Sequence, residues 1–209
     1  VVFDLDGTLL DTLEDLKDAT NAALVSQGMP QCTLEQVRQY VGNGVRKLMI
    51  RAVPDGEENP LFEQTFAAFK AYYGEHCLDH TLPYPDVLNV MKELKERGIK
   101  IAIVSNKLDS AVKELDEKFF AEYTTAAIGE MEGVARKPAP DMVEKALREL
   151  GVAKSDAVYV GDSDVDIQTA QNSGLDCISV TWGFRDVPFL REHGAKTMID
   201  KPQELLSLV

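Results

Sequence analysis

The first twelve residues, VVFDLDGTLLDT (1–12), decide how the rest of the chain is interpreted. A short apolar segment runs into Asp4 and Asp6, and Gly7 and Thr8 follow directly. A carboxylate at the end of an apolar strand is costly to desolvate unless another group compensates its charge. A strand followed by an ordinary Asp-Gly turn would give the same pattern. The remainder of the chain therefore has to decide between a turn and a functional site.

The composition predicts a globular protein with one well-buried core and a smaller second domain. The 209 residues are 44% hydrophobic and 27% charged, and no apolar run approaches the ~18 residues of a membrane span. The net charge of −13 argues against nucleic acids and anionic membranes as partners. The three cysteines are far apart and lack metal-ligand spacing, so we expect reduced thiols in a cytoplasmic protein.

From about residue 86 onward, short apolar runs alternate with amphipathic helical patterns. This alternation predicts right-handed βαβ units and a parallel sheet covered by helices on both faces. Gly151 and Gly174 are expected to end two of the helices. The predicted strands are IKIAIVSN (99–106), YTTAAIG (123–129), DAVYVGD (156–162), DCISVTW (176–182) and AKTMID (195–200), and KPQELLSLV (201–209) is predicted to form a final helix.

Residues 12 to about 80 show helical patterns and no convincing strand. Thr12 is a candidate N-cap, Gly28 a candidate stop, and Thr33 with Gln36 has capping-box spacing. An aromatic helix is expected to bury a stripe made of Leu61, Thr65, Phe69 and Tyr72 or Tyr73. The sequence therefore predicts a helical cap domain at 12–80, inserted after the first strand of an α/β core made of 1–11 and 81–209.

Polar residues gather where the predicted strands end. In parallel sheets ligands bind at the carboxyl ends of the strands, so loops from adjacent strands would bring these residues into one crevice. The residues are Asp4 and Asp6 after the first strand, Ser105 and Asn106 after the second, Asp162, Asp164 and Asp166 after a later one, and Arg136 and Lys137 in the loop ARKPAP (135–140).

This set of residues suits phosphoryl transfer. Asp4 and Asp162 supply the hard oxygen ligands that Mg²⁺ prefers, and a carboxylate can attack phosphorus to form an aspartyl-phosphate. A second acid two residues along the chain would protonate the leaving oxygen and later activate water. Lys137 would balance the negative charge of the nucleophile and the phosphate. A metal ion and a lysine would make the site locally cationic despite the net charge.

Four segments of the sequence, taken in order, resemble the four motifs of the haloacid dehalogenase superfamily of phosphatases. They are DLDGTLLDT (4–12), IVSN (103–106), RKPAPD (136–141) and GDSDVD (161–166), and the resemblance covers essentially the whole chain. The helical insertion is similar to the cap of the phosphoglycolate-phosphatase-like subgroup, as are YVGNGVRKLM (40–49), PYPDV (83–87) and SNK (105–107). One departure is Asp86, where such proteins often have glycine, which should affect a turn rather than the chemistry.

The resemblance implies a role for each matching position. Asp4 would be the nucleophile and a Mg²⁺ ligand, Asp6 the general acid/base and a ligand through its carbonyl, and Asp162 the third protein ligand. Asp166 would either orient Lys137 or hold a metal-bound water. The residues expected to position the phosphate are Thr8, Ser105, Asn106 and Lys137, and the cap loop 42–47 would contact the substrate through Asn43, Gly44 and Arg46. A plain helix–helix turn with a solvated basic pair remains the alternative for that loop.

The predicted function is that of a Mg²⁺-dependent phosphatase acting on a small organic phosphate monoester, with 2-phosphoglycolate as the preferred substrate. A pyrophosphatase, nucleotidase, sugar phosphatase or phosphomutase would use the same site. A catalytically silent regulatory binding module is the alternative from another class. Whether the protein is a monomer or a homodimer stays open, as does whether TWGF (181–184) forms an interface patch or part of the core.

Overall fold

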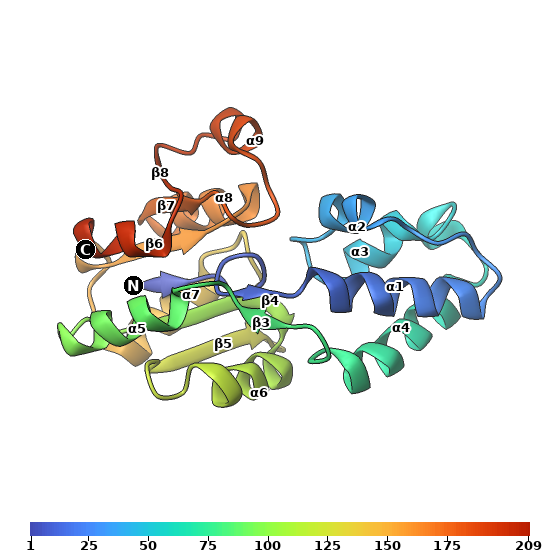
Figure 1. The fold of residues 1–209 in the computed structure, drawn as a ribbon, viewed down its shortest axis with the longest axis horizontal. Helices are drawn as coiled ribbons and strands as arrows, with labels where there is room; N and C mark the ends of the chain where they lie inside the picture. The colour runs from blue at the N-terminus through green and yellow to red at the C-terminus, as the bar shows by residue number, and fades with distance from the viewer. The chain divides into compact units, whose positions relative to one another are not determined.

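The computed structural model describes residues 1–209 and divides them into two compact units (Figure 1). Val1–Leu10 with Pro83–Val209 form the first, called the core unit here, and Asp11–Leu82 form the second, the helical unit. Two short strands, β2 (Leu10–Asp11) and β3 (Leu82–Pro83), pair where the chain passes from one unit to the other and back. None of the helices combines the length and apolar composition that a membrane-spanning helix requires.

The core unit is built on one six-stranded sheet with the order β5-β4-β1-β6-β7-β8. Every described pairing in this sheet is parallel. The strands are β1 (Val2–Phe3), β4 (Ala102–Leu108), β5 (Ala126–Glu130), β6 (Val158–Gly161), β7 (Asp176–Val180) and β8 (Thr197–Ile199). The predicted α/β class with a parallel sheet is confirmed, and β1 lies in the interior of the sheet between β4 and β6.

Helices follow the strands of the core unit as the alternating pattern predicted. Helices α6 and α7 pack on β4 and β5, and α8 packs on β6 and β7. Gly151 and Gly174 end α7 and α8 in the left-handed conformation, as expected. The helices are α5 (Val87–Glu96), α6 (Asp109–Phe119), α7 (Asp141–Leu150), α8 (Asp164–Ser173) and α9 (Val187–Glu192), with a short 3₁₀ helix η2 (Lys154–Asp156).

The final helix predicted at 201–209 is confirmed, with shorter bounds and 3₁₀ rather than α geometry. The segment forms a 3₁₀ helix, η3 (Pro202–Ser207), which packs against α5. Leu205 is the one buried residue of this helix. A single buried position does not give the apolar stripe that stabilises an α-helix by packing, and six residues are too few for propensity to do so.

The helical unit contains α1 (Leu13–Ser26), α2 (Leu34–Tyr40), α3 (Val45–Ala52), η1 (Gly56–Glu58) and α4 (Phe62–His76). Helix α1 packs mainly against α4. The predicted capping box is confirmed, because Gln36 N donates to Thr33 Oγ1 (3.2 Å) and Thr33 N donates to Gln36 Oε1 (2.8 Å). Gly28, at φ 68°, follows the last turn of α1 as expected.

Two local predictions in the helical unit are wrong. The Thr12 hydroxyl does not cap α1, because Thr12 has ψ 4° rather than the extended backbone of a capping residue. The buried stripe of α4 consists of Phe62, Thr65, Phe66, Phe69 and Tyr73. Leu61, which was predicted to belong to it, precedes the helix and is 39% exposed. The spacing 62, 66, 69, 73 keeps these aromatic rings on one helical face.

Asp86 precedes α5 with φ 66°, a left-handed conformation that favours glycine. We expect Asp86→Gly to raise the free energy of unfolding by about 0.5–1 kcal/mol, because the strain on Cβ is relieved. Urea denaturation measures this change. Asp86→Ala is the matched control, since it removes the same carboxylate but keeps a Cβ, and it should give no gain. Equal stability of the glycine and alanine variants would contradict the prediction.

Candidate active site

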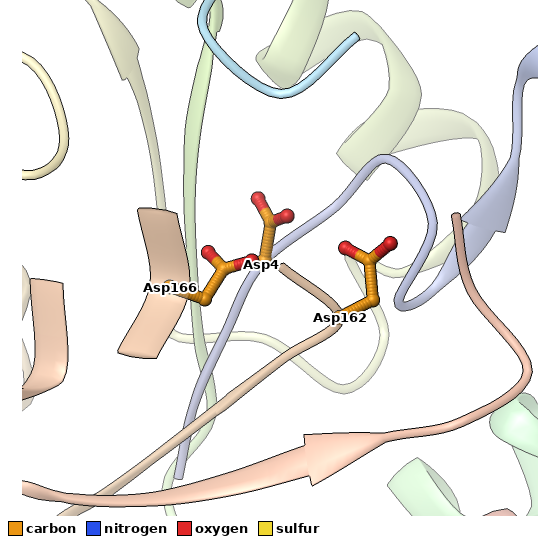
Figure 2. Close-up of side chains that lie close together, drawn as sticks. All are labelled: Asp4, Asp162 and Asp166. Carbon is orange, nitrogen blue, oxygen red and sulfur yellow. The ribbon is translucent and has the colours of Figure 1, made fainter. Parts of the chain in front are cut away.

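Three buried carboxylates from separate elements of the core unit lie side by side (Figure 2). Asp4 follows β1, Asp162 follows β6, and Asp166 lies in the first turn of α8. One oxygen from each lies within 4.8 Å of the others. Strands β1 and β6 are parallel neighbours, so their carboxyl ends meet, and Asp4 N donates to Val160 O (2.8 Å). The sheet therefore brings together the acids expected from its strand ends.

Lys137 is the cation of this cluster. Its Nζ lies 2.6 Å from Asp4 Oδ1, 2.8 Å from Asp166 Oδ1 and 3.0 Å from the Tyr159 hydroxyl. These three contacts use all three donors of an ammonium group. The Lys137 side chain is only 3% exposed, so both ion pairs are shielded from solvent. The aspartate expected to be the nucleophile thus lies against a positive charge.

Asp166 has no free oxygen for a further ligand. Its Oδ1 accepts from Lys137 and from the Tyr159 hydroxyl (3.0 Å), and its Oδ2 accepts from Ser163 N (3.1 Å) and Ser163 Oγ (2.6 Å). Of the two roles expected for Asp166, these contacts favour orientation of Lys137.

Tyr159 was not identified as a site residue from the sequence. Its polar hydroxyl within the apolar run AVYV was the available signal, because a buried tyrosine hydroxyl usually has a partner.

Asp162 is fixed by the loop 181–184, for which the sequence left an interface patch and a core role open. Its Oδ2 accepts a hydrogen bond from Phe184 N (2.7 Å), and Phe184 is buried. A Cβ on Gly183 would lie 2.3 Å from Asp162 Cβ, so the close approach of this loop requires glycine. Trp182 Nε1 donates to Thr8 O (3.1 Å). The segment TWGF (181–184) is therefore part of the site wall and core.

Gly7 lies in a turn directly beyond the two aspartates. Its φ is 87°, a conformation that residues with a Cβ rarely adopt. A Cβ at this position would also lie 2.4 Å from Asp162 Oδ2. Both the backbone conformation and the contact with Asp162 therefore require glycine here.

The electrostatics of the cluster are dominated by burial and by the proximity of the carboxylates. Burial, followed by the charge of Asp166, raises the pKa of Asp4 well above its usual range, while Lys137 opposes this rise. Burial and Asp166 also raise the pKa of Asp162 to about 7. Three carboxylates share one lysine, so the ionised cluster has a deficit of positive charge.

The donor set of this cluster fits a divalent cation. Lys137 Nζ donates to Asp4 Oδ1 and Phe184 N donates to Asp162 Oδ2, so these two bonds leave Asp4 Oδ2 and Asp162 Oδ1 for other partners. Two carboxylates supplemented by water and phosphate oxygens form the coordination that Mg²⁺ favours. A divalent cation would also supply the missing positive charge. Asp166 is already saturated and is the least suited of the three acids to bind it.

Asp6 lies outside the group of three acids and is paired with a different cation. Lys107 Nζ lies 3.0 Å from Asp6 Oδ1, and the Lys107 side chain is only 5% exposed. Lys107 was not among the predicted site residues. It directly follows Ser105 and Asn106 at the carboxyl end of β4, which was the signal available in the sequence.

The remaining predicted phosphate-binding residues are buried beside these groups. Thr8 Oγ1 is buried and has no hydrogen-bond partner within the protein. Ser105 Oγ accepts from Lys107 N (3.2 Å) and keeps its own proton to donate. Asn106 Nδ2 donates to Lys137 O (3.1 Å). Asn106 therefore holds the loop that carries Lys137, and its contact with phosphate stays a prediction.

The predicted substrate residues of the cap loop belong to the helical unit and are engaged within it. Arg46 pairs with Glu57 and Glu63 and lies over the rings of two phenylalanines. Asn43 Oδ1 accepts from Arg51 (2.8 Å), and Gly44 caps α3 with φ 81°. These contacts favour a structural role for Arg46. Its predicted contact with substrate has no support in them.

Comparison with known proteins gives a consistent assignment. The model of the family described as haloacid dehalogenase-like hydrolase matches residues 1–180. Phosphoglycolate phosphatase 1 of Pseudomonas aeruginosa is 34% identical, with 99% of this chain and 78% of that protein covered. Phosphoglycolate phosphatase of Aquifex aeolicus is 33% identical, with 100% and 95% covered.

A solved structure agrees with these sequence relatives. It is a protein of Lactobacillus delbrueckii subsp. bulgaricus, provisionally assigned as a phosphoglycolate phosphatase, with a TM-score of 0.95 and 39% identity. The alignment covers 99% of this chain and 96% of that one. The predicted superfamily and the predicted enzyme class are confirmed. With the acids, the lysine and the parallel sheet in place, the chain belongs to the haloacid dehalogenase-like hydrolase family.

Proposed function

We propose that the protein is a Mg²⁺-dependent phosphatase that hydrolyses 2-phosphoglycolate through an aspartyl-phosphate. The observation that carries this proposal is the buried contact of Asp4 with Lys137, beside the carboxylate of Asp162. This contact supports the assignment of Asp4 as the nucleophile, Lys137 as its counter-charge and Asp162 as a second metal ligand. The relatives named phosphoglycolate phosphatase support the choice of substrate.

The reaction proceeds in two steps, formation of the aspartyl-phosphate and its hydrolysis. An oxygen of Asp4 attacks phosphorus, the ester P–O bond breaks, and Asp6 gives its proton to the leaving oxygen. Water then attacks the phosphorus of the aspartyl-phosphate, Asp6 takes a proton from that water, and inorganic phosphate leaves as the Asp4 carboxylate is regenerated. Lys137 balances the charge beside Asp4 throughout, and the unpartnered hydroxyl of Thr8 donates to a phosphoryl oxygen.

Asp4, Asp162 and the backbone carbonyl of Asp6 are proposed to hold the Mg²⁺. When bound, the ion neutralises charge on the phosphoryl oxygens and favours attack by an anionic nucleophile. Lys137, which also contacts Asp166, pairs with Oδ1 of Asp4. The cytoplasmic location and the monomeric or dimeric state expected from the sequence stay predictions.

Release of inorganic phosphate tests the proposed function. The wild-type protein is incubated with 2-phosphoglycolate, pyrophosphate, a nucleoside monophosphate and a hexose phosphate, each with Mg²⁺ and with a chelator. We expect Mg²⁺-dependent release that is fastest from 2-phosphoglycolate. Faster release from another compound would instead indicate the pyrophosphatase, nucleotidase or sugar phosphatase activity that corresponds to it. No release from any ester by folded protein would contradict the proposal and favour a silent binding module.

Binding of Mg²⁺ is expected to depend on pH. A carboxyl with a pKa raised to about 7, as for Asp162, must lose a proton to bind the ion. The affinity should therefore rise as pH increases from 6 to 8, by up to about tenfold per pH unit below pH 7. Isothermal titration calorimetry in two buffers of different ionisation enthalpy would detect the released proton. Equal affinity at pH 6 and pH 8, with no proton release, would contradict the prediction.

A further inference from the structure

The contact between Lys107 and Asp6 is not explained by the mechanism above. The Nζ–Oδ1 distance is 3.0 Å, and the side chains of Lys107 and Asp6 are 5% and 23% exposed. Charge-assisted hydrogen bonds are shorter and stronger than neutral ones, and solvent screens them little when one partner is buried. This contact can therefore fix the orientation of the Asp6 carboxylate.

The backbone at Lys107 is itself held in an irregular part of β4. The register between β4 and β5 shifts between Val104 and Leu108, so the strand departs from regular pairing just before it ends. Lys107 N donates to Ser105 Oγ (3.2 Å) instead of continuing a regular ladder. Irregularities of this kind re-aim side chains at the ends of strands. Here the irregular segment carries Lys107, whose side chain reaches Asp6.

The neighbouring strand supports this segment through a glycine. A Cβ on Gly129 of β5 would lie 2.7 Å from Lys107 O and 2.4 Å from Asp109 Cα. Gly129 N also donates to Asp109 Oδ1 (2.9 Å). Residues 107–109 therefore pack directly against the β5 backbone. The position of the Lys107 backbone is set by packing, independently of the ion pair with Asp6.

We propose that Lys107 is a positioning residue for Asp6. Its ammonium group holds the Asp6 carboxyl group where it can reach the leaving oxygen. This inference rests on the proposed function, in which the ester P–O bond breaks and the proton of Asp6 moves to the ester oxygen. A general acid must lie within hydrogen-bond reach of the atom it protonates, so a loss of orientation slows the step.

A positioning role predicts a dependence on the leaving group. The alkoxide of glycolate is a poor leaving group and needs a proton as the P–O bond breaks, whereas 4-nitrophenolate leaves without one. The ratio kcat/KM reports the steps up to formation of the aspartyl-phosphate. Attack by water comes later and is common to both esters. Misplacement of Asp6 should therefore lower kcat/KM for 2-phosphoglycolate much more than for 4-nitrophenyl phosphate.

The test compares Lys107→Met with the wild-type protein on these two esters. We expect kcat/KM to fall on the order of 10- to 100-fold for 2-phosphoglycolate and less than about 3-fold for 4-nitrophenyl phosphate. Asp6→Asn should show the same selectivity more strongly, and Lys107→Arg should recover part of the rate. Lys92→Met, at an exposed position of α5, is the matched control and should leave both values unchanged.

The outcomes separate this inference from the function on which it rests. Equal losses on both esters, or no loss on either, would overturn the role of Lys107 while the wild-type protein remains a phosphatase. No Mg²⁺-dependent release by the wild-type protein would overturn the proposed function and this inference with it. If Lys107→Met does not fold, Lys107→Gln provides the same comparison. A crystal structure of the Gln variant should show the Asp6 carboxylate rotated away from its original position, and an unmoved carboxylate would contradict the proposal.

Discussion

Replacing Asp4 with asparagine is expected to abolish Mg²⁺-dependent phosphate release. The amide keeps the size of the side chain and an oxygen that can accept from Lys137, which lies 2.6 Å from Asp4 Oδ1. It lacks the anionic oxygen that attacks phosphorus and binds the metal. Removal of a nucleophile that acts together with other catalytic groups costs on the order of 10⁴- to 10⁶-fold in kcat. Phosphate release under saturating 2-phosphoglycolate measures the loss.

The Asp4→Asn variant should nevertheless remain folded. Burial and the carboxylates of Asp166 and Asp162 raise the pKa of Asp4, because these neighbouring acids repel its ionised form, while Lys137 opposes the rise. A neutral side chain removes this repulsion, and we expect an unchanged or higher Tm without Mg²⁺. Asp176→Asn, at the exposed amino end of β7, is the matched control and should keep full activity. Activity of Asp4→Asn within tenfold of wild type would exclude Asp4 as the nucleophile.

Replacing Lys137 with methionine is expected to have the largest effect on stability. The ammonium group is the single cation in contact with the buried carboxylates of Asp4 and Asp166. Methionine fills a similar volume but leaves both acids without a counter-charge. Breaking a buried ion pair on one side costs about 3–5 kcal/mol, because an uncompensated charge stays buried. Urea denaturation at neutral pH without Mg²⁺ would measure this loss.

Two comparisons test the physical reason for this loss. Adding Asp166→Asn to Lys137→Met removes one of the orphaned carboxylates and should recover part of the stability. Lowering the pH should also reduce the difference in unfolding free energy between Lys137→Met and the wild-type protein. Carboxyl groups with raised pKa values take up protons at lower pH and become neutral. Lys113→Met, which breaks the exposed pair with Asp109, should cost at most about 1 kcal/mol. A loss of less than about 1 kcal/mol for Lys137→Met would contradict the assignment of Lys137 as the central counter-charge.

The elements of the fold could be predicted where they depend on local sequence. The period of apolar residues identified the strands and helices of the core unit, and Gly151 and Gly174 end helices where expected. The failures were local as well. Leu61 was assigned to α4 because the apolar pattern could not fix where the helix begins, and the Thr12 hydroxyl was expected to cap α1 although its backbone is not extended.

The site was predicted as a set of strand ends, because a parallel sheet brings its carboxyl ends to one edge whatever the strand order. Asp4, Asp162 and Lys137 followed from that rule. The hydrogen-bond and ion-pair partners of these residues could not be predicted from that rule. Lys107 meets Asp6 across 101 residues, Lys137 meets Asp4 across 133, and Phe184 fixes Asp162 across 22. Such contacts depend on the order β4-β1-β6 and on the approach of the 181–184 loop, which no local pattern encodes.

The sequence by itself thus determined which chemical groups stand at the edge of the sheet. Only the tertiary structure decided how each is used. It placed Asp166 against Lys137 and Tyr159, and it paired Lys107 with Asp6. The physical reason is that a side chain's type is a local property. Its hydrogen-bond partners and its burial arise from packing between distant segments, and these fix its charge and orientation.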